Sequence, residues 1–472
     1  MCFDGIFSGN NAVRDYRQHM VKEFTMAGGT STERKHPFAL TNANVITGDA
    51  DGTVLSATTV VVDAAGTIEQ VAPSAEVPVP IGYRRIDLAG EYVLPGLINA
   101  HAHLFADGKP LPSLFTNESM EGLVAAAFHS PLGKLLVKRR AKSNILTQLY
   151  SGVTTLRSLG DSAYEVVAVR DEIDGGRYVG PRVLASGPLL AVSGGHGTPG
   201  IALVSDSPWQ ARRNVRVNLR HGVDVIKIAA TGGVTDARAV GEAGRPQMTE
   251  EEMAAICDEA HKAGKIVAAH AESGKGVKDA LRAGVDTIEH GSEMDAEMIE
   301  LFKENPRSLR GFSALVPTLM AVLPLVKLDQ RMTGASSIVR ENARIILDRV
   351  IRAIHDAAEN DIPIGMGTDS ALTYVTHYNT WREMDYVVRY GGLTPARALQ
   401  AATRTNARIL GLEGITGSVE PGQAADLVVL RANPLDKFRS FSDPRMVIAR
   451  GAIIDNPTVE RFEQIDARLD SF

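Results

Sequence analysis

Cysteine is almost absent from this sequence, and long hydrophobic runs and blocks of one charge are missing. The two cysteines, Cys2 and Cys257, exclude a disulfide framework, and no stretch of about 18 apolar residues predicts a transmembrane helix. The 50 basic and 56 acidic side chains give a net charge of −6 without a basic stripe, which argues against nucleic-acid and membrane partners. An apolar content of 44% with 22% charged residues is typical of a globular protein.

The first residues contain no apolar core of the length that a secretory signal requires, because charged side chains interrupt every short apolar piece. Residues 25–37 read as a polar linker, so residues 1–37 are expected to be an extension and linker. We therefore expect a cytoplasmic protein. Cys257 falls in a helical pattern and is expected to be a small core residue.

Short β-type runs separated by Gly, Asp and Pro turns fill residues 38–90, and similar runs return in residues 417–456. The two flanks are expected to form one small composite β-sandwich domain. Between them, in residues 91–416, short apolar strands alternate with longer amphipathic segments, which predicts β-α-β units and a parallel sheet. Residues 457–472 remain as a C-terminal tail.

Strand-like runs in this middle segment predict an α/β fold, specifically a (β/α)8 TIM barrel. A doubly wound open sheet is the alternative, but no glycine-rich phosphate turn follows the first run. Helical patterns fill the gaps, as in 338–360 and in 248–264, where Thr249 and Glu252 have the spacing of a capping box. The eight expected strands are residues 93–104, 154–160, 182–187, 224–231, 265–271, 287–291, 314–319 and 363–369.

Two histidines, His101 and His103, stand near the end of the first run. Because side chains alternate along a strand, both imidazoles lie on one face, where both can reach a single metal ion. Such a pair also arises by chance among twelve histidines, so alone it is a weak indication.

Lys227 interrupts DVIKIAA, an apolar strand that a barrel would bury on both faces. A buried ammonium is costly, so such a lysine tends to lose its proton. The structural alternative is a lysine paired with a neighbouring carboxylate such as Asp224.

Three more polar residues, His270, His290 and Asp369, end apolar runs. A lone histidine at a strand end is more often a hydrogen-bonded structural residue than a ligand. Barrel enzymes, however, place their active sites at the carboxyl ends of the strands. Convergence of all these groups at one end of one barrel predicts an active site.

The strand ends carry the strings YVLPGLINAHAHL, DVIKIAATGGV, VAAHAESGKGVKDALRAGVDTIEHGSEMD, VPTL and GMGTDS, followed by LTPARALQAATRTNARILG and GSVEPGQAADLVVL. In this order they resemble the amidohydrolase superfamily of metal-dependent hydrolases, over residues 38–456. The chain looks most like the branch of Xaa-Pro dipeptidases and related metallo-carboxypeptidases, with imidazolonepropionase more distant. Enzymes that hydrolyse ochratoxin, arylureas and thiocarbamates belong near the same branch.

The resemblance implies a centre of two divalent ions, zinc first, with manganese, cobalt or iron as alternatives. It also implies that CO2 adds to Lys227 and that the carbamate bridges both ions, although the number of ions stays open. By that resemblance, the more buried ion is bound by His101 and His103, and the second ion by His270 and His290. Asp369 would contact the first ion and a bridging hydroxide, take the proton of the hydroxide and pass it to the leaving nitrogen.

Three further histidines are candidate pocket residues. His129 lies where relatives carry a histidine that polarises the substrate carbonyl, with a solvent-facing helix position as the alternative. His196, in GGHG, would bind substrate or else stand exposed in a tight turn. His377 resembles a substrate-contacting segment with altered spacing, and Arg157 in TTLRSLGD is expected to be a structural ion-pair member.

The predicted function is hydrolysis of a C–N amide bond in a small-molecule substrate, of dipeptide or N-acyl amino acid type, by an enzyme that forms homo-oligomers. The alternative substrate is an aromatic amide, urea or (thio)carbamate xenobiotic, including ochratoxin-like amides. A carboxylate-binding Arg or Tyr in the pocket would favour the first class, and an aromatic-lined cleft the second. A non-catalytic barrel scaffold is a distant alternative. The presence of all six expected ligand residues argues against it, because non-catalytic relatives typically lose metal ligands.

Overall fold

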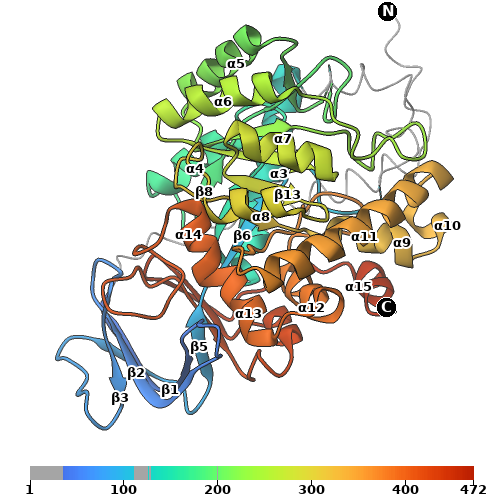
Figure 1. The fold of residues 1–472 in the computed structure, drawn as a ribbon. Coiled ribbons are helices and arrows are strands. Elements are labelled where there is room, and N and C mark those ends of the chain that lie inside the picture. Colours follow the sequence, from blue (N-terminus) through green and yellow to red (C-terminus); the bar gives the residue numbers. More distant parts are fainter. Residues whose placement is uncertain (1–35, 111–125, 127–128, 199) are drawn as a thin grey trace, which may run out of the picture.

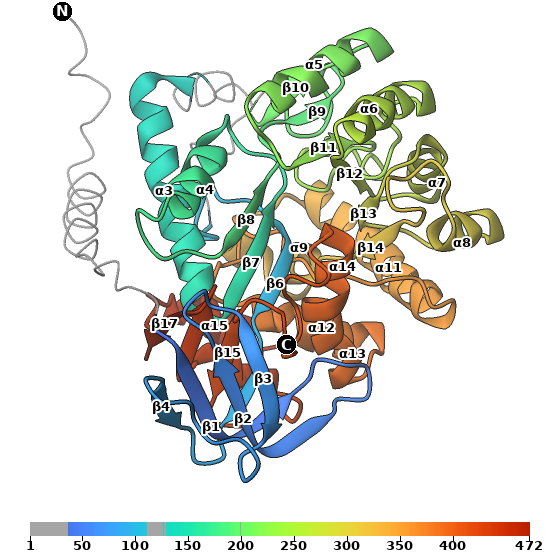
Figure 2. The ribbon, with the colours of Figure 1, turned by 90° about the vertical axis from the view of Figure 1, so that its left-hand side faces the viewer.

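The computed structural model describes residues 36–110, 126, 129–198 and 200–472, so nearly all of the predicted extension and linker lies outside the described residues. The fold is mixed α/β, with one β-rich end and a larger body in which helices surround parallel strands (Figures 1 and 2). The strands are β1 Phe38–Ile46, β2 Val54–Val62, β3 Ile68–Pro73, β4 Arg84–Asp87, β5 Tyr92–Pro95, β6 Leu97–Ala102, β7 Val153–Ser158, β8 Arg182–Ala185, β9 Leu189–Ala191, β10 Ala202–Val204, β11 Val225–Ala229, β12 Ile266–Ala271, β13 Thr287–His290, β14 Ala314–Val316, β15 Leu427–Leu430, β16 Met446–Ala449 and β17 Ala452–Asp455.

The helices begin where the sequence provides capping side chains. Thr249 and Glu252 form the predicted capping box of α6, and Ser130, Ser207 and Thr394 each cap a helix whose next residue is proline. None of the helices in the described part of the chain has the length and apolar character needed to cross a membrane. The helices are α3 Pro131–Tyr150, α4 Glu165–Asp174, α5 Pro208–Arg220, α6 Glu250–Lys262, α7 Gly274–Ala283, α8 Ala296–Lys303, α9 Leu319–Lys327, α10 Gln330–Thr333, α11 Ser337–Glu359, α12 Thr380–Gly391, α13 Pro395–Gln400, α14 Asn406–Leu410 and α15 Glu463–Leu469, with a π-helical turn at Ala401–Thr405 and a 3-10 turn at Phe438–Ser442.

Strands from both flanks share one mixed sheet at the β-rich end. Its order is β17-β16-β15-β5-β1-β2-β3, and β4 also pairs with β1. The predicted first strand of the middle segment is therefore divided, because Gly96 separates β5, which joins this sheet, from β6, which does not. The predicted β-sandwich, in which two sheets would pack face to face, stays a prediction.

Parallel strands form the larger body. One sheet has the order β6-β7-β8 and the other β10-β9-β11-β12-β13-β14, and the long pairings within them are parallel. Helices α5 to α8 lie outside β11 to β14 (Figure 2). Pairing among the described residues gives two sheets, so closure into one barrel stays a prediction.

The eighth expected strand, residues 363–369, does not form a regular strand. The segment is tied instead by isolated parallel bridges from Ile364 to Leu315 and from Ser370 to Ala102. It passes very close to β6, where a Cβ at Gly367 would lie 2.5 Å from the His101 Cβ. The Ala100 N–H donates to the Met366 carbonyl and the Thr368 N–H donates to the His101 carbonyl, so backbone bonds join the segment to β6. This irregular segment carries Asp369 to the end of β6.

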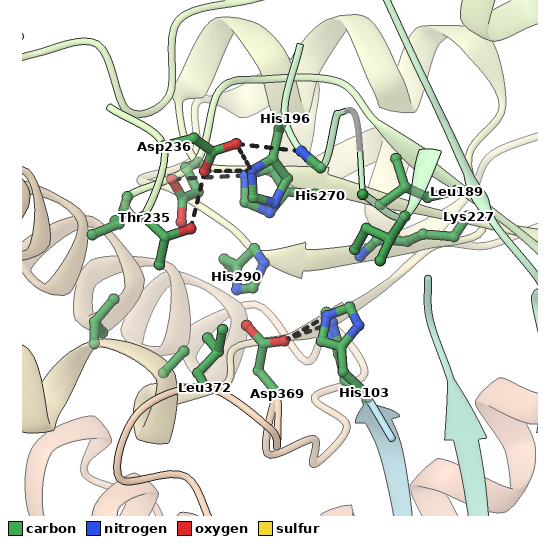
Figure 3. Close-up of a pocket in the computed structure, with 18 of the residues that line it drawn as sticks. His103, Leu189, His196, Lys227, Thr235, Asp236, His270, His290, Asp369 and Leu372 are labelled. Carbon is green, nitrogen blue, oxygen red and sulfur yellow. Dashed lines mark hydrogen bonds and ion pairs between the residues drawn. The ribbon is translucent and has the colours of Figure 1, made fainter. Parts of the chain in front are cut away.

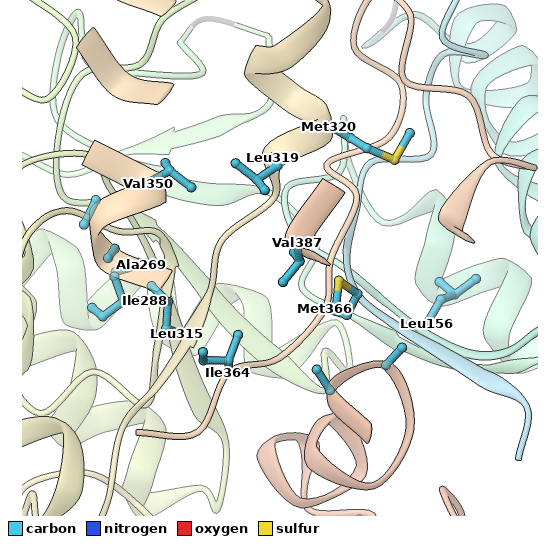
Figure 4. Close-up of a cluster of buried hydrophobic side chains, with 14 of the residues drawn as sticks. Leu156, Ala269, Ile288, Leu315, Leu319, Met320, Val350, Ile364, Met366 and Val387 are labelled. Carbon is cyan, nitrogen blue, oxygen red and sulfur yellow. The ribbon is translucent and has the colours of Figure 1, made fainter. Parts of the chain in front are cut away.

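A buried apolar core joins the parallel strands to the helices around them. Figure 4 shows Leu315, Leu319 and Val387 of this cluster, which come from β14, α9 and α12. Cys257 belongs to the same cluster and is buried, as predicted. The polar side chains discussed next are thus held on a closely packed support.

Candidate metal centre

A cavity of about 360 Å³ opens at the carboxyl ends of the parallel strands. Its polar lining comes from strand ends that are far apart in the sequence, and these side chains point toward one another (Figure 3). All six predicted ligands line it, together with one of the three further histidines. These residues are His101, His103, His196, Lys227, His270, His290 and Asp369.

His101 and His103 meet Asp369 at one side of the cavity. The Asp369 Oδ1 atom lies 3.2 Å from His101 Nε2 and 3.0 Å from His103 Nε2. Asp369 is held there because its backbone N–H donates to the His101 carbonyl over 2.9 Å and its φ is +55°. Burial would raise the pKa of Asp369, but the two histidines lower it well below its usual range. An ionised carboxylate therefore stands between two imidazoles.

A buried ion pair supports His101 from behind. His101 Nδ1 lies 2.7 Å from Glu289 Oε2, and Arg157 donates to Glu289 Oε1 over 2.8 Å. Arg157 and Glu289 are fully buried, which confirms the expectation that Arg157 is an ion-pair member. Burial would raise the pKa of Glu289, but Arg157 and His101 lower it. With Nδ1 engaged, Nε2 of His101 is the nitrogen left for a metal ion.

Lys227 lies in β11 with only 2% of its surface exposed, and its Nζ has no hydrogen-bond partner among the described residues. Burial lowers the pKa of Lys227 to about 8. The alternative partner Asp224 is occupied elsewhere, because it accepts hydrogen bonds from Arg170 and from the Ala185 N–H. The ammonium of an ordinary lysine would be costly at this position.

His270 and His290 form the other side of the centre. Burial lowers the pKa of His270 well below its usual range and that of His290 to about 3, so both imidazoles are neutral, the form that binds metals. Glu272, two residues after His270, is also buried, and its Oε2 atom has no hydrogen-bond partner among the described residues. Burial raises the pKa of Glu272 to about 8.

Two overlapping groups of ligand atoms can each hold a metal ion. Within each group the atoms lie within 4.8 Å of one another and the side chains are buried. Neutral imidazoles with carboxylates suit zinc and other divalent first-row metals, and the unpartnered Lys227 and Glu272 atoms fit a centre that a cation completes. The groups are His101, His290 and Asp369, and His270, Glu272 and His290.

His196 lines the cavity and is paired with a carboxylate that the sequence did not indicate. Its Nδ1 lies 2.7 Å from Asp236 Oδ2, and its ring stacks on His270 with the centroids 4.2 Å apart. Burial would lower the pKa of His196, but Asp236 raises it. The backbone N–H of His196 donates to Gln247 over 2.9 Å, which fixes the loop.

The other two candidate histidines lie away from the cavity. His129 is exposed just before α3. His377 is buried, and its nitrogens lie 2.7 Å from the Ala106 carbonyl and 3.1 Å from Gln148 Nε2, contacts that hold the backbone beside β6. Burial lowers the pKa of His377 to about 4. The structure thus brings seven of the nine predicted site residues together.

An aliphatic wall faces the polar groups across the cavity. Ala321, Val322 and Leu325 come from one face of α9, and Leu372 follows the Asp369 segment. Among the described lining residues there is no Arg or Tyr, and Phe105 is the single Phe, Tyr or Trp. The described lining therefore has neither the Arg or Tyr expected for an amino-acid substrate nor the aromatic walls expected for a xenobiotic.

The amidohydrolase family model matches residues 92–454. The chain belongs to the amidohydrolase family. Among solved structures, this amidohydrolase is 49% identical to a Bifidobacterium longum protein proposed to be a prolidase, which matches with a TM-score of 0.82 over 93% of this chain and 99% of that one. A Xaa-Pro dipeptidase solved with bound methionine is 29% identical, with a TM-score of 0.76 over 89% and 100% of the two chains.

Ochratoxinase of Aspergillus niger is 27% identical to this amidohydrolase in an alignment 383 positions long, which covers 75% of this chain and 73% of that one. These relatives and the family model identify the chain as a hydrolytic enzyme acting on carbon–nitrogen bonds.

Three residues of the amidohydrolase centre escaped the sequence analysis. Glu289 interrupts an apolar strand just as Lys227 does, and that anomaly indicates it. Glu272 stands two positions after His270, so strand periodicity places it on the same face. Asp236 lies in an irregular loop, where no pattern in the sequence indicates its pairing with His196.

Proposed function

We propose that this amidohydrolase hydrolyses the amide bond of a dipeptide or an N-acyl amino acid with the help of two divalent metal ions, zinc first. The observation that carries the proposal is the convergence of four histidines, one lysine and one aspartate on a single cavity at the carboxyl ends of the parallel strands. The likeness to a Xaa-Pro dipeptidase over nearly the whole of both chains supports the substrate class.

The residues that would hold the ions are those of the two ligand groups, with His103 and Lys227 added. Bound divalent ions would lower the pKa of water and polarise the scissile carbonyl. Lys227 would contribute as a carbamate: its neutral amine forms a bond to CO2 and releases a proton. The lowered pKa of Lys227, about 8, supports this role, because a larger fraction of the amine is neutral than in an exposed lysine.

Proton transfer falls to Asp369. Its carboxylate is ionised, lines the cavity and contacts both His101 and His103, so it can accept a proton from water and deliver it to the leaving nitrogen. His196 lines the opposite side and has Nδ1 engaged by Asp236, which leaves Nε2 for the substrate. The aliphatic face of α9 would take an apolar side chain.

The proposal includes a closed (β/α)8 barrel. The two isolated bridges support it, because they tie the 364–370 segment to β14 at one end and to β6 at the other. An eighth strand joins the seventh to the first in this way.

Metal analysis and a substrate panel test the proposal. Purified protein should hold at least about one divalent ion per chain, and chelation should abolish hydrolysis until zinc or manganese is restored. Of a panel containing dipeptides, N-acyl amino acids, aryl ureas and carbamates, the first two should have the highest kcat/KM. Preference for the aryl compounds would overturn the substrate class, and metal-free protein that stays inactive after addition of metal would overturn the enzyme function.

A further inference from the structure

The start of α9 lies between a metal ligand and the aliphatic wall of the cavity. Thr318, the residue before the helix, has a φ of +53°, a left-handed conformation that β-branched residues rarely adopt. Its hydroxyl makes no capping bond to α9. Instead, its Oγ1 lies 2.7 Å from Nδ1 of His290. The residue that would normally cap the helix therefore holds a metal ligand.

A carboxylate from another helix caps α9 in its place. The Leu319 N–H donates to Glu383 Oε1 over 2.6 Å, and the Met320 N–H donates to Glu383 Oε2 over 2.7 Å. Glu383 lies in the first turns of α12 and is fully buried. The first N–H groups of a helix have no partner within the helix, and the two carboxyl oxygens of Glu383 satisfy two of them. Leu319 and Met320 appear at the start of α9 in Figure 4.

Nothing else in the described part of the chain neutralises this carboxylate by an ion pair. Burial raises the pKa of Glu383 to about 8, against the two backbone hydrogen bonds that lower it. A buried acid is expensive unless it is hydrogen-bonded, and the Leu319 and Met320 N–H groups supply these bonds. An apolar residue at position 383 would leave both buried N–H groups without a partner. Glu383 is therefore required to hold the start of α9.

We propose that Glu383 is a positioning residue of the metal centre: by capping α9 it frees the Thr318 hydroxyl to orient His290. The same contact fixes the helix face that carries Ala321, Val322 and Leu325 into the cavity. With Nδ1 held by Thr318, Nε2 of His290 is the nitrogen left for a metal ion, so the orientation of the ring governs the ion that it binds. This inference rests on the proposed metal-dependent function.

Three variants test the relay from Glu383 through Thr318 to His290. Glu383→Gln keeps the size of the side chain but can accept only one of the two N–H bonds. Thr318→Val removes the hydroxyl, and Thr318→Ser keeps it. Asp385→Asn is the matched control, since Asp385 lies on the same helix and pairs with Arg389 at the surface.

The first measurement is zinc affinity, by competition of the metal-free protein with a chromophoric chelator. Loss of a group that orients a metal ligand typically weakens binding about 10- to 100-fold, and we expect this range for Glu383→Gln and Thr318→Val. Thr318→Ser and Asp385→Asn should bind as the wild type does. The double variant Glu383→Gln/Thr318→Val should have the same zinc affinity as the single variant that binds zinc less tightly. Both substitutions act through the one contact between Thr318 and His290, so their effects should not add.

The second measurement, hydrogen exchange at the Leu319 and Met320 amides of the metal-free protein, does not depend on metal. Glu383→Gln should accelerate it and Asp385→Asn should not. Unchanged exchange, or faster exchange with wild-type zinc affinity, overturns the relay. Wild-type protein that takes up no metal overturns the proposed function instead, so the two failures are distinguishable.

Discussion

The two sides of the candidate metal centre differ in how their buried polar atoms are satisfied. On the His101 side, Glu289 and Arg157 form a closed network whose contacts are between 2.6 and 3.0 Å. On the Lys227 side, the Lys227 Nζ and one Glu272 oxygen are buried without hydrogen-bond partners among the described residues. The Glu289–Arg157 network behind His101 is complete as folded, whereas the atoms that face the cavity, Asp369 Oδ1 among them, are left open to a further partner.

This difference in hydrogen bonding indicates which buried groups lower the stability of the metal-free fold and are kept for function. Native proteins satisfy nearly all of their buried polar groups, and the exceptions gather at sites that bind a ligand or ion. We therefore expect substitutions on the completed side to cost stability, and substitutions on the open side to cost activity while stabilising the metal-free protein.

The largest effect is expected from Lys227→Met, which replaces the buried amine with an apolar chain of similar length. Loss of a group that completes a metal centre removes several kcal/mol of transition-state stabilisation, so kcat/KM should fall about 1,000-fold or more. The metal-free variant should also unfold at a higher temperature than metal-free wild type at neutral pH, since a buried ammonium has been removed.

Lys262→Met, at an exposed lysine paired with Asp258, is the control and should change neither property. Small carboxylic acids such as propionate should restore part of the activity of Lys227→Met. Near-wild-type turnover of Lys227→Met would exclude the carbamate.

Glu289→Gln should have the next largest effect, because it leaves the fully buried Arg157 without its partner. Breaking a buried pair in this way costs about 3 kcal/mol or more of unfolding free energy, measured by urea denaturation. Glu297→Gln breaks an exposed pair with Arg282 and should cost about 0.2–1 kcal/mol. Equal losses in the two variants would contradict the comparison.

The smallest effect concerns pH. The pKa of Glu272 is raised from 4.5 to about 8 by burial, so between these values the folded protein holds a proton that the unfolded chain releases. Stability of the metal-free protein should therefore fall as the pH rises through this window. Glu272→Gln should reduce that fall by up to about 3 kcal/mol, measured by urea denaturation near pH 5.5 and 8.5.

Glu383 has a similarly raised pKa and contributes to the same window, so Glu272→Gln should not abolish the slope. Glu251→Gln, at an exposed position of α6, should leave it unchanged. A slope that Glu272→Gln leaves at the wild-type value would show that Glu272 is not protonated when metal is absent.

The positions of the principal ligand candidates could be predicted from the sequence because strand periodicity and the strand-end rule are local. His101, Lys227, His270 and His290 each end or interrupt an apolar strand, and the structure brings all four to one cavity. The predicted parallel strands and the capping box of α6 follow from equally local patterns.

What the sequence could not predict depends on close contacts between distant segments. The pattern of residues 363–369 predicts a strand, but the segment is held by isolated bridges and single backbone bonds to β6 and β14, which no local pattern reveals. Glu383 caps a helix that begins more than sixty residues earlier, and periodicity carries no information about such a contact. The contact between His377 and the Ala106 carbonyl also joins segments far apart in the sequence, so no local pattern predicts it.

The β-rich end has a consequence for how the protein is made. Strand β5 lies between β1, which precedes it closely, and β15, which is translated long after it. On the ribosome, one edge of β5 therefore stays unpaired while the whole catalytic segment is being synthesised, and an unpaired strand edge invites association with other chains. We therefore expect that a chain ending before β15 would leave one edge of β5 open to pairing with other chains.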